Sequence, residues 1–376
     1  MSAERIRARL VLDRRVATGM VTLEDGWIAA VESEEDAAGD DLPILAPGFV
    51  DVHVHGWGGH AATGDEAALS GMARALFRQG VTSFLPTAPT LATDELPRFA
   101  DRVRGWIPDA PGDGAEPLGF NLEGPFLAPA RKGAHDPALL VAPDAFPETA
   151  LEPLLDGLRV ITIAPELPGA VTLIEALAAR GVAVSLGHSD ATVEQSRAGY
   201  RAGARSTTHL FNAMRGLDHR APGLAAAALT EDDAWVELIA DGNHVDLDLW
   251  PIVARTKPRD RVLLVSDALP SAGMGDGRTM IGGLPVEVRG GRAVLAGTST
   301  LAGCVIALDT ALRNVVAHGS SLPDAVLATS GNPLALLGQA DRGRIAPGQR
   351  AHLVELDRYL RVRRVTRGDG WIEGAG

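Results

Sequence analysis

The sequence predicts an α/β fold: a (β/α)8 TIM-like barrel, with a small β-sandwich domain formed by both chain ends. Two observations support this. From residue 49 to about 338, short apolar runs alternate with segments of helical pattern, and both ends of the chain read as strands alone. Eight buried strands alternating with helices fit a closed parallel barrel. A doubly wound open sheet is the alternative, but no glycine-rich dinucleotide loop follows any strand.

The chain ends predict β-hairpins instead of barrel units. The runs RARLVLD and ATGMVTLEDGWIAAVES alternate around the turn pair Asp25-Gly26, and the Pro47-Gly48 pair then breaks the pattern. From about 343 to 374, strand-like runs return as HLVEL, RVRRVT and WIEG. The predicted domains are therefore a small one, residues 1–46 and 343–376, and a barrel, residues 47–342.

The central region contains eight apolar runs that we interpret as the barrel strands. They are FVDVHVH (49–55), VTSFLPT (81–87), LGFNLE (118–123), RVITIAPE (159–166), VAVSLGH (182–188), STTHL (206–210), WVELIADGNH (235–244) and RVLLVSD (261–267). Helical patterns cover 65–80, 169–181 and 190–204, and several end in glycine, a common helix stop. A hairpin over 286–295, with Gly290-Gly291 at its turn, interrupts the last strand–helix unit.

Composition narrows the class of protein. The chain has 376 residues and a net charge of −13, which argues against nucleic acid and anionic membranes as partners. Cys304 is the only cysteine, so an intramolecular disulfide and a thiolate zinc cluster are both excluded. The first residues carry scattered charges, and no apolar run reaches signal-peptide or transmembrane length. We expect a cytoplasmic protein, in which an anionic substrate would need a local basic site.

The segment DVHVHG, residues 51–56, predicts metal chemistry. Strand side chains alternate with a period of two, so His53 and His55 lie on the same face. Two imidazoles side by side can chelate one divalent metal. A structural histidine pair is an equally good reading of this motif taken alone.

The other predicted strands also end in possible ligands, and barrel active sites collect at these ends. The groups found there are His53, His55, Thr87, Glu123, Glu166, His188, His209, Asp241 with His244, and Asp267. Four histidines and two acids around one barrel mouth could hold one or two ions. Glu123, in the apolar context NLEGPF, could bridge two histidine pairs; a salt-bridged structural glutamate is the alternative. His318 and His352, away from these ends, read as ordinary surface or structural residues.

The eighth strand ends in Asp267, where an acid would face the water of a bound metal. A metal lowers the pKa of its water to about 7, so a nearby carboxylate can take the proton and later deliver it to a leaving group. A helix N-cap is the alternative role, but a turn follows instead of a helix. Some barrel hydrolases bridge two metals with a carbamylated lysine after the fourth strand. That strand ends here in Ala-Pro-Glu, which argues against a dihydroorotase, hydantoinase or urease-like site.

These residues resemble the amidohydrolase superfamily and, within it, the N-acetylglucosamine-6-phosphate deacetylase family. The resemblance runs over nearly the whole chain. It rests on the motifs PGFVDVHVHG (47–56), NLEGPFLAPARKGAH (121–135), SLGHSDA (185–191), THLFNAM (208–214), HRAPG (219–223), ADGNHVD (240–246), LVSDA (264–268) and STLAG (299–303).

The resemblance implies a role for each matched residue. Glu123, His188 and His209 would bind the main metal, His53 and His55 a second one, and Asp267, counted with the metal site, would be the general base and then acid. His135 would polarise the acetyl carbonyl or hold the intermediate. Contacts to the phosphosugar would come from Ala134, His135, Asn212, Ala213, Leu301, Ala302 and Gly303, and the phosphate would be bound by Arg220 and His244. One or both of these last two would reach the neighbouring site of a homodimer.

The implied activity is metal-dependent removal of the acetyl group from N-acetyl-D-glucosamine 6-phosphate. Zinc is the expected ion, with iron, manganese or cobalt as alternatives. The chain departs from the family at Arg215-Gly216 and Ala221, which flank the presumed phosphate site and leave the sugar open. The alternatives are a deacetylase of the galactosamine epimer, another N-acyl or cyclic-amide hydrolase, and a catalytically silent scaffold.

Overall fold

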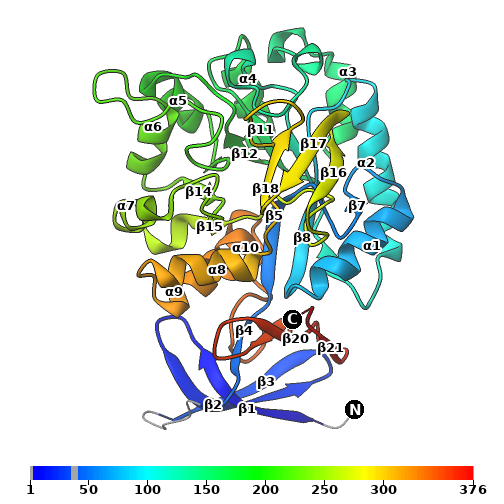
Figure 1. Ribbon diagram of the computed structural model, residues 1–376, viewed down its shortest axis with the longest axis vertical. Helices are drawn as coiled ribbons and strands as arrows, with labels where there is room; N and C mark the ends of the chain where they lie inside the picture. The colour runs from blue at the N-terminus through cyan, green and yellow to red at the C-terminus, as the bar shows by residue number, and fades with distance from the viewer. Residues whose placement is uncertain (1–2, 35–40, 376) are drawn as a thin grey trace.

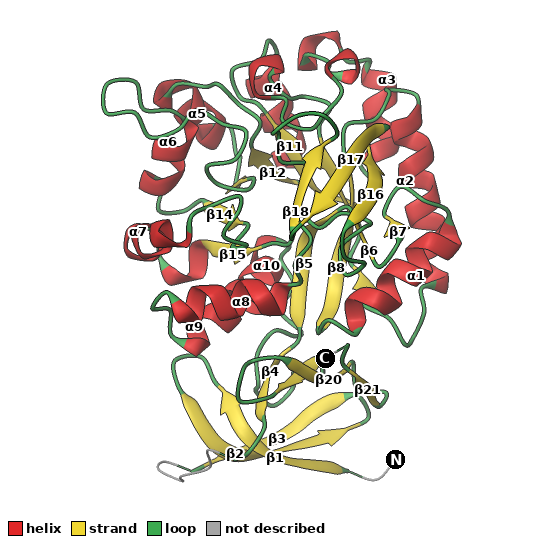
Figure 2. Ribbon diagram, in the orientation of Figure 1, coloured by secondary structure: helices red, strands yellow, loops and turns green. Residues whose placement is uncertain are grey.

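The computed structural model describes residues 3–34 and 41–375, so residues 1–2, 35–40 and 376 of the predicted small domain lie outside it. A barrel is built on one side of a smaller sheet, and helices surround the barrel strands (Figures 1 and 2). The barrel strands run in the order β15-β14-β13-β12-β11-β10-β8-β5, each parallel to the next. The predicted barrel is confirmed.

The eight barrel strands agree with the predicted runs, although several are shorter. They are β5 (Phe49–Val54), β8 (Val81–Ala88), β10 (Phe120–Glu123), β11 (Leu158–Ile163), β12 (Ala183–Leu186), β13 (Ser206–Thr207), β14 (Trp235–Leu238) and β15 (Val262–Leu264). The sixth and seventh predicted strands were too long, because residues 208–213 and 239–244 leave the ladder and become loops at the barrel mouth. The barrel closes between its first strand, β5, and its last, β15. The N–H of Asp267, just after β15, donates to the carbonyl oxygen of His53 in β5 at 2.8 Å.

The helices around the barrel bury their apolar faces against the strands. The longer ones are α1 (Glu66–Phe77), α2 (Glu95–Trp106), α4 (Ala170–Ala179), α5 (Val193–Arg201) and α8 (Leu308–Ala317), with α3 (Glu148–Leu151), α6 (Leu224–Thr230), α7 (Trp250–Thr256), α9 (Leu322–Val326) and α10 (Asn332–Leu336) shorter. The helix predicted over 190–204 begins later, because Thr192 and Gln195 form a capping box that satisfies the first free N–H groups.

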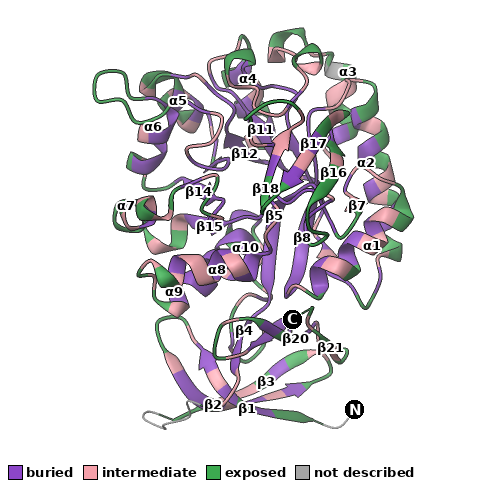
Figure 3. Ribbon diagram, in the orientation of Figure 1, coloured by how far each residue is buried: buried purple, intermediate pink, exposed green. Residues whose placement is uncertain are grey.

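Apolar side chains fill the barrel and close its lower end. Strands β5 and β8 are buried along their whole length (Figure 3). Inside, Val52, Leu85 and Leu263 pack with Leu334 and Leu337 from the region of α10, so this segment plugs the end opposite the strand tips. The site therefore lies at the carboxyl ends of the strands, as in other barrels of this type.

Both chain ends contribute to one seven-stranded sheet, with the order β21-β20-β19-β4-β1-β2-β3. The strands are β1 (Glu4–Val11), β2 (Val16–Glu24), β3 (Trp27–Ser33), β4 (Ile44–Pro47), β19 (Leu353–Leu356), β20 (Val362–Thr366) and β21 (Trp371–Glu373). At the predicted turn, Asp25 and Gly26 have φ of 50° and 81°, as a tight hairpin requires. The division of the chain into two domains stays a prediction.

A third sheet stands over the barrel mouth. It contains β16 (Gly277–Ile281), β17 (Leu284–Arg289) and β18 (Arg292–Leu295), and follows the barrel strand β15 in the chain. The hairpin of β17 and β18 was predicted, whereas β16 was not. Val286 and Val288 pack with Leu269 and Ala302 in a small core of their own, which fixes the sheet beside the strand ends. Among the described residues, every helix is too short or too polar to cross a membrane.

Candidate active site

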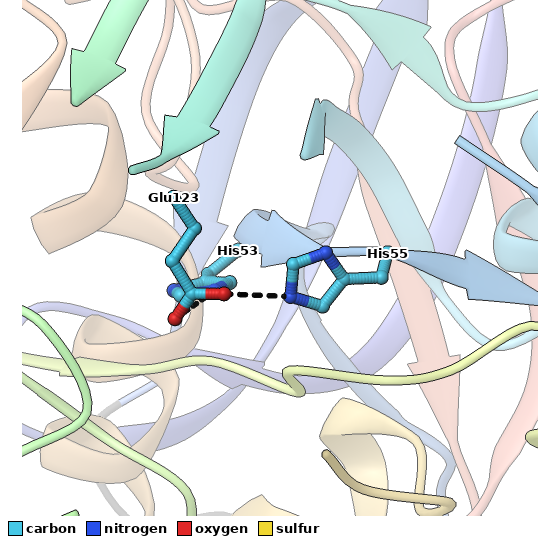
Figure 4. Close-up of side chains that lie close together, drawn as sticks. All are labelled: His53, His55 and Glu123. Atoms are coloured by element: carbon cyan, nitrogen blue, oxygen red, sulfur yellow. Dashed lines mark ion pairs between the residues drawn. The ribbon is translucent and has the colours of Figure 1, made fainter. Parts of the chain in front are cut away.

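The predicted ligands converge on a single carboxylate, Glu123, at the end of β10. Figure 4 shows its oxygens directed at the rings of His53 and His55, which both come from the end of β5. Its two oxygens lie between 2.9 and 3.5 Å from the Nε2 atoms of five imidazoles, those of His53, His55, His135, His188 and His209. A fifth strand end, that of β15, adds Asp267, whose Oδ1 lies 3.1 Å from His55 Nε2.

Every member of this cluster is buried, with at most 7% of the residue exposed. The backbone at three of them is unusual. His188, His209 and Asp267 have φ of 46°, 27° and 50°, in the left-handed region that non-glycine residues rarely adopt. Such conformations cost about 1–3 kcal/mol each and concentrate at functional sites. Here they turn the chain out of the strand and the side chain into the barrel mouth.

In three of the histidines, a hydrogen bond at Nδ1 decides which ring nitrogen carries the proton. The Nδ1 atoms of His55 and His188 lie 3.1 and 2.9 Å from the backbone carbonyl oxygens of Thr87 and Arg131, which can only accept. His53 Nδ1 lies 3.1 Å from a carboxylate oxygen of Glu237. Each Nδ1 therefore carries the proton, so the neutral ring presents a lone pair on Nε2 toward Glu123. This is the usual arrangement of a metal-binding histidine.

His135 has the opposite arrangement. The backbone N–H of Thr90 donates to its Nδ1 at 3.2 Å, so this nitrogen is an acceptor. The neutral ring must then carry its proton on Nε2, the atom that faces Glu123. His135 is thus a hydrogen-bond donor toward the site, although its position also fits a metal group with Glu123 and His188. The predicted carbonyl-polarising role needs this donor.

The spacing of the acceptor atoms fits a cation. His188 Nε2 and His209 Nε2 lie 3.1 Å apart, and each lies 2.9 Å from Glu123 Oε1. Around a tetrahedral ion with bonds near 2.1 Å, neighbouring ligand atoms are about 3.4 Å apart. His53 Nε2 is buried without a hydrogen-bond partner, 3.5 Å from Glu123 and 3.6 Å from Asp267. The group of His53, His55 and Glu123 could hold a metal ion.

The carboxylates of the cluster stabilise positive charge on His55, whereas burial lowers the pKa of His188 to about 4. Burial would lower the pKa of His55, but Asp267 and Glu123 outweigh it and raise the pKa to about 9. Burial would raise the pKa of Glu123, but His53 and other neighbouring histidines hold it well below its usual value. The carboxylates thus stay ionised and stabilise whatever cation lies among them, because Coulomb interactions are strong in a buried site.

Glu237, on β14, is a residue of the site that the sequence reading missed. It is fully buried, and its Oε2 accepts from His53 Nδ1 at 3.1 Å and from the backbone N–H of His209 at 3.2 Å. One carboxylate therefore orients two of the predicted ligands. The available signal was an acid within the apolar run WVELIA, where an unpaired carboxylate would be costly to bury.

A cavity of about 390 Å³ opens above the cluster. Beside the cluster residues, all but one of the predicted substrate contacts line it: Ala134, His135, Asn212, Ala213, His244, Leu301, Ala302 and Gly303. His244 Nδ1 lies 2.8 Å from Asp241 Oδ2, which positions the ring. The size of the cavity and its mixture of polar and apolar lining residues suit a small polar ligand.

One predicted phosphate ligand, Arg220, and two predicted strand-end groups, Glu166 and Thr87, do not line the cavity. Arg220 is exposed, does not line the cavity, and its backbone N–H donates to Asp218. Glu166 accepts from the Ser189 hydroxyl at 2.7 Å and from a backbone N–H, so its described contacts are structural. The Thr87 hydroxyl joins β5 to β8, since it accepts from the backbone N–H of Val54.

Comparison with known proteins gives three kinds of similarity. A family model described as the amidohydrolase family matches residues 44–367. The N-acetylgalactosamine-6-phosphate deacetylase of Escherichia coli O157:H7 is 38% identical over 384 residues, covering 98% of each chain. The N-acetylglucosamine-6-phosphate deacetylase of Bos taurus is 40% identical over 337 residues, covering 85% of this chain and 81% of the bovine one.

Solved structures agree with these relatives. The N-acetylglucosamine-6-phosphate deacetylase of Thermotoga maritima superposes with a TM-score of 0.91 at 32% identity, covering 99% of this chain and 100% of the other. A mutant of the Mycobacterium smegmatis enzyme, in complex with N-acetyl-D-glucosamine-6-phosphate, superposes with a TM-score of 0.90 at 34% identity and 99% coverage of both chains.

Proposed function

Because the chain belongs to the amidohydrolase family, we propose that it hydrolyses N-acetyl-D-glucosamine 6-phosphate to glucosamine 6-phosphate and acetate. One observation carries the proposal: a buried carboxylate, Glu123, lies among five imidazoles at the floor of a cavity of substrate size. The bovine and Thermotoga relatives are named for this activity.

The donor set fits a divalent ion. Glu123, His188 and His209 would hold the main ion, and His53 with His55 a second one; zinc suits imidazole and carboxylate ligands, with iron, manganese and cobalt as alternatives. When bound, such an ion supplies a water of lowered pKa and polarises a carbonyl oxygen.

The protein's own groups would move the proton and orient the amide. Asp267 stays ionised, because His55 and His53 hold its pKa below the usual value against the effect of burial. It would accept a proton from the attacking water and return it to the amide nitrogen as the C–N bond breaks. His135, with its proton on Nε2, would donate a hydrogen bond to the carbonyl oxygen as negative charge develops there.

The remaining contacts would hold the sugar phosphate. Asn212, Ala213, Ala134 and the backbone of 301–303 would contact the sugar, with His244 at the phosphate. Arg220, which lies outside the cavity of its own subunit, would reach the neighbouring site of a homodimer. A charged phosphosugar does not cross membranes, so we propose a cytoplasmic location for the enzyme.

Acetate release tests this function. The metal-loaded protein should release acetate from N-acetylglucosamine 6-phosphate, and far less from unphosphorylated N-acetylglucosamine. N-acetylgalactosamine 6-phosphate belongs in the same assay, because the Escherichia coli relative is named for that epimer. Asp267→Asn is the matched control for acetate from a contaminant. Equal rates on phosphorylated and unphosphorylated sugars, or no release from either, would reject the proposal in favour of another N-acyl substrate.

A further inference from the structure

The sheet over the barrel mouth brings an arginine, Arg292, to the wall of the candidate active-site cavity. Arg292 is the first residue of β18 and lines the cavity. The strand is tied to the cavity wall, because the N–H of Ala302 donates to the carbonyl oxygen of Ala293 at 3.1 Å and Val294 bridges to Leu301. The strand that carries the guanidinium is therefore held in place by its bonds to residues 301 and 302, which line the cavity.

The turn before Arg292 also contacts the loop that carries His244. Asn243 Nδ2 donates to the carbonyl oxygen of Gly291 at 3.5 Å. Arg292 and His244 thus follow contacting residues, and both line the same cavity. The guanidinium and the imidazole therefore belong to one part of the wall and come from two different elements.

Arg292 has no carboxylate partner among the described residues. The nearby acid of the same sheet, Glu287, pairs with Arg278 at 3.0 Å and with Arg289 at 3.3 Å. The other basic side chain of this wall, His244, already has a carboxylate partner, because its Nδ1 lies 2.8 Å from Asp241 Oδ2. Arg292 is therefore the one uncompensated cation among the cavity-lining residues outside the histidine cluster. In a chain with a net charge of −13, such a group is a local attraction for an anion.

We propose that Arg292 binds the phosphate of the substrate from within the same subunit, beside His244. This rests on the proposed function and adds to it a residue that selects for the phosphate. A guanidinium presents two parallel N–H donors to phosphate oxygens, which a lysine cannot reproduce. Arg220 of the partner subunit would then add a third phosphate contact to those made by Arg292 and His244 of one chain.

Paired variants test the assignment. Arg292→Ala should raise KM for N-acetylglucosamine 6-phosphate by about tenfold or more, with kcat nearly unchanged, because phosphate contacts are made equally in ground and transition states. Arg292→Lys should recover only part of the loss. Arg289→Ala is the matched control, since Arg289 lies on the same sheet, is largely exposed and does not line the cavity. It should behave as wild type, and activity on the unphosphorylated sugar should be alike in all four proteins.

A binding measurement separates this inference from the proposed function. Calorimetric titration of the metal-loaded protein with glucosamine 6-phosphate and with glucosamine needs no turnover. Arg292→Ala should lose about tenfold in affinity for the phosphorylated amine alone. If wild type turns over the phosphosugar and Arg292→Ala has the same KM and affinity, the phosphate-binding role of Arg292 is overturned, while the proposed deacetylase activity is retained. If wild type neither binds nor hydrolyses the phosphosugar, both fail.

Discussion

Replacing Glu237 by glutamine should weaken metal binding without changing the shape of the site. Its Oε2 accepts from His53 Nδ1 and from the His209 N–H, so the carboxylate holds one predicted ligand by its ring and another by its backbone. An amide oxygen can occupy the same position but lacks the charge that makes the imidazole more basic. Losing such a partner typically costs 10- to 100-fold in metal affinity, or about 1.4–2.7 kcal/mol.

The structure adds a second cost. Glu237 Oε1 is buried without a hydrogen-bond partner among the described residues, so an NH2 group there would be an unsatisfied donor. An unsatisfied buried polar group costs about 1–3 kcal/mol of stability. We therefore expect Glu237→Gln to lower both the metal affinity and the melting temperature, and to release first the ion that His53 and His55 would bind.

The assay is competition with a chromophoric chelator, together with elemental analysis after dialysis. Glu355→Gln is the control: Glu355 is also a buried strand carboxylate, but it pairs with Arg364 at 2.7 Å in the small sheet. That variant should lose stability and keep its metal. Wild-type metal content and affinity in a folded Glu237→Gln protein would refute the reasoning that this carboxylate positions a ligand.

Three further outcomes are expected. Glu123→Ala should lose both metal and activity, and full turnover by a variant that elemental analysis shows to be metal-free would contradict the metal site. Asp267→Asn should keep metal and fold but lose several powers of ten in kcat, because an amide cannot accept the proton; near wild-type turnover would reject the proton shuttle. Burial and the charge of Arg342 lower the pKa of His352 to about 2, so below pH 6.5 only the unfolded chain gains a proton there. The free energy of unfolding should then fall as the pH drops, by up to about 1.4 kcal/mol per pH unit from this group, and urea titrations of His352→Gln should show a flatter dependence.

Much of the site was accessible from local sequence. The period of two in DVHVHG places His53 and His55 on one face, and the alternation of strands with helices predicts that Glu123, His188 and Asp267 share one edge of a barrel. All five meet within hydrogen-bonding or ligand distance. These inferences succeed because side-chain alternation and helix stops depend on a few neighbouring residues.

Other predictions from the sequence needed correction. For His352 the sequence left a surface or a structural role open, and its burial, with 4% exposed, fits the structural role. The predicted sixth strand, 206–210, is too long: its ladder ends at Thr207, and the chain then turns so that His209 enters the site with a positive φ. A strand's hydrophobic pattern does not mark where its neighbours stop pairing with it.

Tertiary structure alone decided how distant residues act on one another. Glu237 meets His53 across 184 positions of sequence, and the tautomer of His135 depends on the N–H of Thr90, 45 positions away. Arg292 reaches the cavity because a separate sheet packs over the mouth, while Arg220 does not line it. Such distances follow from how strand tilt and stagger close the barrel, a property summed over all eight strands. No local pattern in the sequence contains the combined tilt and stagger of eight strands. The sequence by itself therefore predicted which residues could do the chemistry, and only the closed barrel decided which of them meet.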